Sequence, residues 1–164
     1  MQIAAGGQGI SPASIQETPS FIPEDQRERL WKQLLQAMKD SYVTIDGVEY
    51  KKEQGGWIVK NDEGTYDLVR IPRDEASATS KQNELWFSFP TKTSEIPKYA
   101  IGTLHTHTIP ESTVLPSEKD IELSRILGLP GIIVGPNRNT MRIDLRTYDR
   151  NTRVVTPKLE KRKK

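Results

Sequence analysis

The first regular pattern of apolar positions along the chain lies in residues 24–40. Its apolar members recur three and four residues apart, as on one face of a helix: Leu30, Trp31, Leu34, Leu35 and Met38. Pro23 stands just before this stretch, and the acids Glu24 and Asp25 follow it, where they suit the positive end of a helix dipole. We therefore expect one amphipathic helix over residues 24–40.

From residue 43 onwards the pattern changes to short runs of β-branched and aromatic residues that are separated by turn residues. We expect strands over residues 56–60, 65–71, 84–89, 99–107, 131–134, 141–148 and 152–155. The sequence Asn61-Asp62-Glu63-Gly64 predicts a hairpin turn between the first two of these strands. Residues 73–83 and 91–97 are polar and are expected to form loops.

A second helix is predicted shortly after the strand at residues 99–107. Pro116-Ser117-Glu118 is typical of a helix start, and Gly128 is typical of a helix end. The order of elements is then helix, several strands, helix, strands. This order indicates an α/β or α+β fold, in which helices pack on a sheet.

The chain of 164 residues is long enough for one domain. Residues 1–22 are rich in Gly, Ser, Pro, Ala and Gln, which predicts a disordered arm or linker. Residues 23–156 are expected to form the folded domain, and residues 157–164 a basic tail. The net charge of +2 comes from that tail, which holds five basic residues and one acid. Nucleic-acid binding is therefore not expected, and the arm or the tail is where other protein partners would bind.

The start of the chain resembles no ordinary secretory signal, because it has neither a basic stretch nor an apolar one. The longest nearly apolar run, residues 127–135, is far shorter than the roughly 20 residues that a membrane helix needs. We expect a cytoplasmic protein that does not enter membranes, and export by a specialised secretion system is compatible with this sequence.

The sequence has few residues of the types that bind metals, and this limits the kinds of site that it can form. The sequence has no cysteine, which excludes disulfides, thiolate zinc sites, iron–sulfur clusters and a cysteine nucleophile. Its two histidines, His105 and His107, are two residues apart, and such residues share one face of a strand. Two neighbouring imidazoles suit Zn²⁺, whose catalytic sites take three protein ligands and a water. The third ligand must then be a carboxylate.

A carboxylate stands at a suitable place in Ser117-x-x-Asp120, which nine intervening residues separate from His107. On its own this pattern is better interpreted as a capping box, in which Ser117 caps the helix and Asp120 hydrogen-bonds back to it. Behind a His-x-His strand, the same helix start would also bring a carboxylate and a hydroxyl to the end of that strand.

Together, His105-Thr106-His107 and Ser117-x-x-Asp120 resemble the signature of the JAMM metalloproteases, the catalytic branch of the JAB/MPN domain. The resemblance covers roughly residues 24–155. It implies a JAB/MPN-like fold, a curved mixed β-sheet flanked by the N-terminal helix and by a second helix after the His-x-His strand. Gly-Thr-Leu-His-Thr-His and the Gly-Gly-Trp strand look closest to bacterial toxin-associated members.

The resemblance also implies roles for individual residues. His105, His107 and Asp120 would bind one Zn²⁺, and Ser117 would hydrogen-bond the water or the oxyanion. Glu53, in Glu53-Gln54-Gly55-Gly56-Trp57, would be the general base. The alternative base is Glu49, and Glu63 is disfavoured because its hairpin turn should lie away from the site. The implied activity is hydrolysis of a peptide or isopeptide bond in a protein or ubiquitin-like substrate.

The sequence departs from the family pattern in the loop between the two motifs, which is longer than usual and has Thr108 where proline is usual, with Pro110 later. Three other interpretations stay open. A cupin-like site would use Glu111 as the third ligand, although cupins also need a later histidine. The others are a non-catalytic JAB/MPN-like scaffold that binds proteins and a chance pair of histidines without metal.

Overall fold

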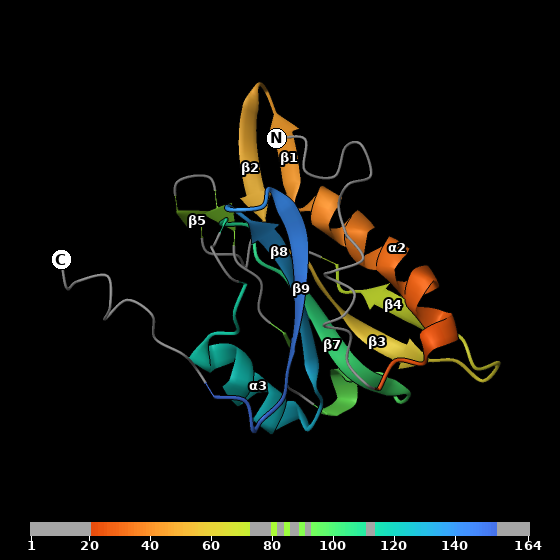
Figure 1. Cartoon of the computed structure of the whole chain (residues 1–164). Coiled ribbons are helices and arrows are strands. Elements are labelled where there is room, and N and C mark those ends of the chain that lie inside the picture. The colour runs from red at the N-terminus through yellow and green to blue at the C-terminus, as the bar shows by residue number, and fades with distance from the viewer. Residues whose placement is uncertain are drawn as a thin grey trace.

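The structure of the chain, a computed structural model, describes residues 21–72, 80–81, 84–85, 89–90, 93–110 and 114–153. Its helices are α2 (Glu24–Asp40) and α3 (Glu118–Leu127), and Thr93–Glu95 forms a 3-10 turn. The strands are β1 (Tyr42–Ile45), β2 (Val48–Lys52), β3 (Gly55–Lys60), β4 (Tyr66–Arg70), β5 (Ser80–Lys81), β6 (Glu84–Leu85), β7 (Ala100–Thr106), β8 (Gly131–Asn137) and β9 (Arg142–Tyr148). Figure 1 labels these elements.

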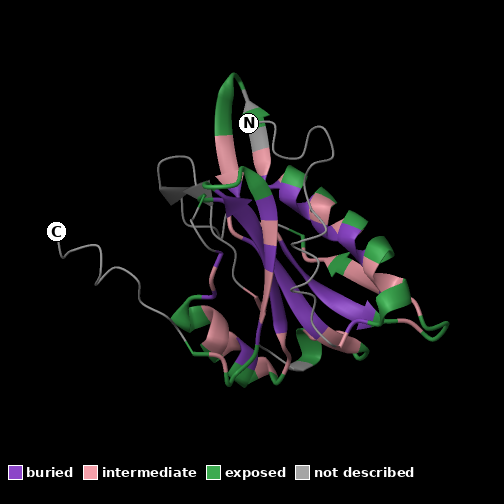
Figure 2. Cartoon of the chain, in the orientation of Figure 1, coloured by how far each residue is buried: buried purple, intermediate pink, exposed green. Residues whose placement is uncertain are grey.

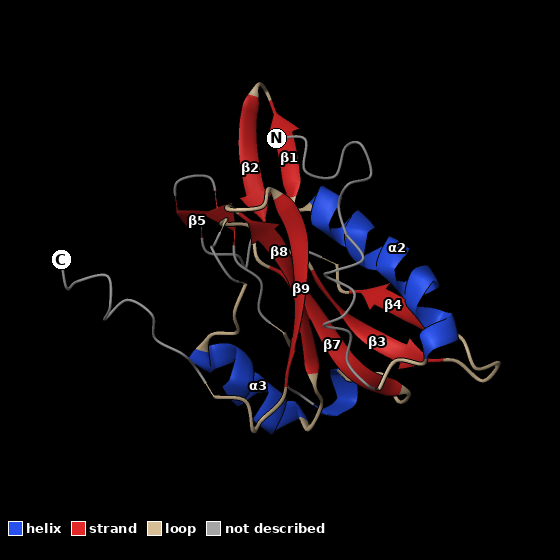
Figure 3. Ribbon diagram, in the orientation of Figure 1, coloured by secondary structure: helices blue, strands red, loops and turns tan. Residues whose placement is uncertain are grey.

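Five strands form the central sheet, in the order β4-β3-β7-β8-β9. β7 and β8 are parallel, whereas the other neighbours are antiparallel, so the sheet is mixed. A smaller sheet has the order β1-β2-β6-β5. The predicted α+β fold, a mixed sheet with an N-terminal helix and a second helix after the His-x-His strand, is confirmed (Figure 3).

The two faces of the central sheet carry different cores. On one face α2 packs its apolar side onto the sheet, and the fully buried members of this cluster include Leu30, Leu34, Met38, Ile58, Leu104 and Ile132. On the other face Ile133 joins Val114 and Tyr148, with Ile121 of α3 packed against them. Because Ile132 and Ile133 are consecutive on β8, they point to opposite faces. The sheet is therefore covered on both sides, and its inner strands β3, β7 and β8 are buried along most of their length (Figure 2).

α2 also contacts the edge of the sheet through two glutamines. The side-chain oxygen of Gln26 accepts a hydrogen bond from the backbone N–H of Tyr66 at 3.2 Å, and that of Gln33 accepts one from Leu68 at 2.6 Å. Both amides belong to β4, the last strand on that side, and they point away from β3. The helix thus supplies the acceptors that a further strand would otherwise provide.

A hairpin that the sequence analysis did not predict precedes the central sheet. β1 and β2 pair as antiparallel strands through a turn at Asp46-Gly47, where φ is 52° and 80°. An Asp-Gly pair with both φ angles positive is the usual turn of a two-residue hairpin, so a local signal was present. The hairpin ends at Lys52, and this brings the chain directly to Glu53 and the start of β3.

The bounds of the folded region differ in part from the expected ones. Ile22 is fully buried in the α2 core, and the ring of Phe21 packs over Gly102, so packing starts before residue 23. Residues 152–153 are not in a strand, and 154–155 lie outside the described residues. The rest of the predicted arm, residues 1–20, lies outside them as well, and so does the tail at 157–164.

In the described part of the chain, neither helix is long and apolar enough to span a bilayer.

The contact between α2 and the β3–β4 hairpin converges on Asp67. Its carboxylate accepts hydrogen bonds from Gln33 at 2.8 Å, from Arg29 at 2.7 Å and 3.0 Å, and from Asn61 at 2.5 Å. The hydrogen bond from Gln33, followed by the hydrogen bond and charge of Arg29 and the hydrogen bond from Asn61, lowers the pKa of Asp67 against the opposing effect of burial. The ionised carboxylate therefore stabilises the fold.

We expect Asp67→Asn to lower the free energy of unfolding at pH 7 by about 1 kcal/mol, because one charged acceptor of several hydrogen bonds is lost. The native pKa is lowered, so this stabilisation is present above the unfolded pKa of about 3.9 and disappears as the pH falls towards the native value. Urea unfolding of both proteins at pH 7 and pH 3 should show the difference shrinking at low pH. Asp62→Asn, at an exposed position of the same hairpin, is the control. Equal differences at both pH values would contradict the assignment.

Candidate metal centre

The two histidines lie at the end of β7, on the face of the sheet that α3 covers. Leu104 belongs to the core under α2, so His105, the next residue, points to the opposite face. His105 is buried, with 6 % of its surface exposed, and His107 just beyond the strand is partly buried. The backbone N–H of His107 donates to the carbonyl of Val134 at 2.9 Å, which extends the pairing with β8 past the strand end.

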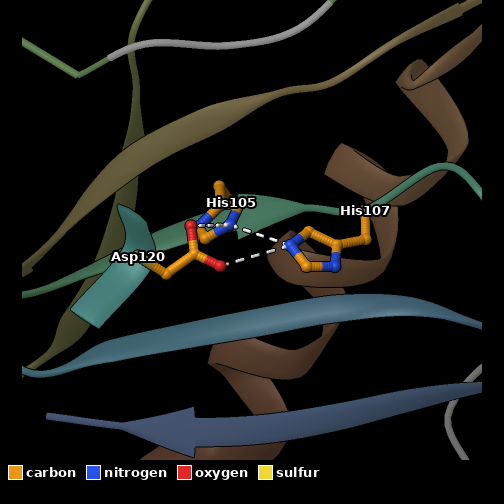
Figure 4. A group of neighbouring side chains, drawn as sticks. All are labelled: His105, His107 and Asp120. Atoms are coloured by element: carbon orange, nitrogen blue, oxygen red, sulfur yellow. Dashed lines mark hydrogen bonds and ion pairs between the residues drawn. The ribbon is translucent and has the colours of Figure 1, made fainter. Parts of the chain in front are cut away.

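Three side chains converge at this point (Figure 4). Nε2 of His105 lies 3.1 Å from Nε2 of His107. Oδ1 of Asp120 lies 3.2 Å from Nε2 of His105, and Oδ2 lies 3.6 Å from Nε2 of His107. Among the described residues this is the group of histidines and acids whose atoms are placed to hold a metal ion.

Asp120 reaches the histidines because of the way α3 begins. The backbone N–H of Ser117 donates to Oδ2 of Asp120 at 2.8 Å, and the N–H of Asp120 donates to Oγ of Ser117 at 3.2 Å. This reciprocal pair is a complete capping box. The same contact that starts the helix therefore fixes the direction of the carboxylate, so the capping interpretation and the ligand interpretation describe one arrangement.

The separations of the three side chains fit a small tetrahedral ion. Donor atoms about 2.0–2.1 Å from a tetrahedral zinc ion lie about 3.3 Å from one another. The two imidazole nitrogens, at 3.1 Å, and Oδ1 of Asp120 with Nε2 of His105, at 3.2 Å, are close to this value, whereas the 3.6 Å contact with His107 is made by the other oxygen, Oδ2. With one ligand atom taken from each residue, the three atoms lie within 4.8 Å of one another. Two imidazole nitrogens and one carboxylate oxygen are also a donor set that zinc sites use, with a further position left for water. The residues present thus fit the ion that the sequence predicts.

The hydrogen bonds and the charge around Asp120 favour its ionised form despite its burial. Burial alone would raise the pKa of Asp120, but hydrogen bonds from His105 and His107, the charge of His105 and the backbone N–H of Ser117 lower it well below its usual range. The carboxylate is therefore negative in the folded chain, as a metal ligand must be.

Aromatic rings surround His105 on the same face. The ring of Phe89 and that of Tyr148 each stand edge-on to the imidazole, with centroids 6.3 Å away. Tyr148 lies across Gly131, where a Cβ atom would come within 2.3 Å of the tyrosine ring, so only glycine fits. Burial, together with the charge of Asp120, raises the pKa of Tyr148. The sequence analysis missed both rings, because no local spacing links them to the histidines.

Glu53, the expected general base, lies between β2 and β3 and is half-buried. Gly55 pairs with His105 across the sheet, and the N–H of Thr106 donates to the carbonyl of Gln54 at 2.9 Å. Continuing this antiparallel register by one residue brings the backbone of Glu53 opposite His107. Glu53 is not a member of the converging group of three.

The other expected residues lie as follows. Glu49 is exposed on β2 near the tip of the β1–β2 hairpin. Glu63 is exposed in the turn after β3, at the opposite end of that strand from Gly55, which pairs with His105. Ser117 is exposed, and its oxygen accepts the N–H of Asp120, which leaves its hydroxyl proton able to donate elsewhere. Glu111, the third ligand of the cupin-like alternative, lies outside the described residues.

Comparison with known proteins finds similarity at the level of solved structures. No protein-family model matches the sequence, and no curated protein matches it either. Among solved structures, the chain is similar to a JAB1/MPN domain protein from Archaeoglobus fulgidus, with 19 % sequence identity and a TM-score of 0.41. The similarity covers 76 % of this chain and 90 % of that protein.

Proposed function

We propose that this chain is a zinc-dependent hydrolase of the JAMM type, which cleaves a peptide or isopeptide bond in a protein substrate. The observation that carries the proposal is the convergence of the imidazoles of His105 and His107 with the carboxylate of Asp120, at 3.1 to 3.6 Å from one another. These are the residues that the resemblance to the JAMM signature assigns to the metal.

His105, His107 and Asp120 would hold the ion. When bound, zinc polarises a substrate carbonyl and lowers the pKa of a coordinated water towards about 7. In our proposal the carboxylate of Glu53 accepts a proton from water as the water oxygen bonds to the carbonyl carbon. Glu53 then gives that proton to the departing amine as the C–N bond breaks.

Ser117 has the second role in the proposed reaction. Its hydroxyl oxygen already accepts the N–H of Asp120, and its proton would be donated to the carbonyl oxygen as negative charge develops there.

The half-buried position of Glu53, next to the residue that pairs with Thr106, supports its role as the base. A ubiquitin-like substrate, toxin association and a cytoplasmic location follow from the resemblance or the sequence alone and stay proposals.

We expect purified wild-type protein to contain about one zinc ion per chain, since three protein ligands make one site. Asp120→Asn should lose most of this zinc while it keeps the helix cap, because an amide oxygen still accepts the N–H of Ser117. Glu118→Gln, in the same first turn of α3, is the matched control and should retain zinc. Elemental analysis after dialysis gives the zinc content.

Glu111→Ala separates this metal centre from the cupin-like alternative. We expect Glu111→Ala to keep its zinc, whereas His107→Ala should lose it. If Glu111→Ala lost the metal and Asp120→Asn kept it, the proposed ligand set would be wrong.

Glu53→Gln should keep its zinc and its fold and lower cleavage by about 10²–10⁴-fold, the usual contribution of a general base. Glu49→Gln is the control, because it removes an acid from β2 and should leave the rate unchanged. A proteomic comparison of wild type with Glu53→Gln would provide the substrate. Full activity of Glu53→Gln would remove Glu53 from the mechanism, and a zinc-loaded wild type that cleaves no substrate would favour a non-catalytic scaffold.

A further inference from the structure

The residue between the two histidines points to the other side of the sheet. Thr106 is fully buried, and its Oγ1 lies 2.8 Å from the backbone nitrogen of Gln54 and 2.7 Å from Oγ of Ser41. Ser41 is the residue that directly follows α2 and is also fully buried. The hydroxyl of Thr106 therefore joins the end of β7 to two other parts of the chain.

The direction of each hydrogen bond in this group follows from the number of protons. Oγ of Ser41 donates its single proton to the carbonyl of Ala37 at 2.9 Å. It must then accept the proton of Thr106, which leaves the oxygen of Thr106 to accept the N–H of Gln54. The result is one continuous series, from Gln54 through Thr106 and Ser41 to Ala37, in which each hydroxyl donates once and accepts once. Such fully satisfied buried networks are rigid.

Gln54 makes further hydrogen bonds through both its backbone and its side chain. Its carbonyl accepts the N–H of Thr106 at 2.9 Å, so these two residues are bonded in both directions. Its side-chain oxygen accepts Nη2 of Arg70 at 2.7 Å, and its Nε2 donates to the carbonyls of Asp40 at 3.4 Å and Lys52 at 3.3 Å. The position of the chain next to Glu53 is consequently fixed relative to the histidine-bearing strand.

The imidazole of His105 has little other support. A metal-binding histidine usually donates its second ring nitrogen to an acceptor, which orients the ring. Nδ1 of His105 is buried and has no hydrogen-bond partner within the described residues. The ring is placed by its backbone, by the contact of its Nε2 with Asp120 and by the edges of Phe89 and Tyr148. Whatever fixes the backbone of β7 at this point therefore also fixes the ligand.

We propose that Thr106 is a positioning residue for a divalent transition-metal ion: its buried hydroxyl, bonded to Gln54 and Ser41, holds the imidazoles of His105 and His107 in their converged arrangement before the ion binds. This inference rests on the metal centre proposed above. Thr106 does not contact the ion, but in this proposal its hydroxyl contributes measurably to the affinity of the site for the ion.

The test is the affinity for Zn²⁺ alone, measured by competition with a chelator. Thr106→Val removes the hydroxyl and keeps the shape, and it should weaken binding about 10-fold or more, as loss of a contact behind a ligand does. Thr106→Ser keeps the hydroxyl and should bind within about threefold of wild type. Leu104→Val is the control: it removes one methylene group from a buried side chain on the same face of the same strand, outside this series, and it should also stay within about threefold.

Amide hydrogen exchange gives a second readout that needs no metal. The N–H of Gln54 donates to the Thr106 hydroxyl, so its exchange should become at least about tenfold faster in Thr106→Val and change by less than about threefold in Leu104→Val. If Thr106→Val does not fold, Ser41→Ala replaces it, because Ser41→Ala removes the acceptor of the Thr106 proton, together with the hydrogen bond to Ala37, and leaves the Thr106 hydroxyl in place. Unchanged Zn²⁺ affinity in the folded variant of this pair would overturn the proposal.

The outcomes also separate this inference from the proposed function. A wild-type chain that does not bind Zn²⁺ removes the metal centre and this inference with it. A wild type that binds Zn²⁺ while Thr106→Val binds it equally well removes the inference alone. An equal loss of affinity in Leu104→Val would also overturn it, because the effect would then belong to the packing of the strand and not to this hydroxyl.

Discussion

The register of β7 between β3 and β8 is the constraint on which the rest of the structure depends. It sets Leu104 and Thr106 on the side of α2, and His105 on the side of α3. A shift by one residue would exchange the two faces. The imidazole of His105 would then enter the apolar core, and Leu104 would take its place beside Asp120. One strand thus serves a core and a polar site at the same time, and neither can form unless the other does.

The charge of Asp120 links the site to the secondary structure. A carboxylate at the third position of a helix is stabilised by the helix dipole and by the N–H of Ser117. This stabilisation compensates part of the cost of burying a negative group between two imidazoles. Within the described residues, the contacts of this ionised, largely covered carboxylate come from the two imidazoles and from the backbone N–H of Ser117, and not from a lysine or an arginine.

The sequence predicted those features whose cause lies within a few neighbouring residues. The bounds of α2, the capping box at Ser117 and the side-by-side histidines all follow from local spacing. The turn at Asp46-Gly47 was also local and was overlooked, whereas the order of strands was not predictable from any short segment. The link from Thr106 to Gln54 and the ring of Tyr148 over the site depend on contacts between distant parts of the chain, for which one sequence holds no signal.

The two glutamines that α2 places on β4 have a consequence for how the protein behaves when it is stressed. Gln26 and Gln33 occupy amides that would otherwise be available to another chain. Fraying of the helix would expose these amides together with its apolar face, and an open strand edge next to apolar surface is a template for intermolecular pairing. Unfolding of α2 and self-association of the chain should therefore occur together. In addition to its part in the core, α2 thus protects the edge strand β4 from aggregation.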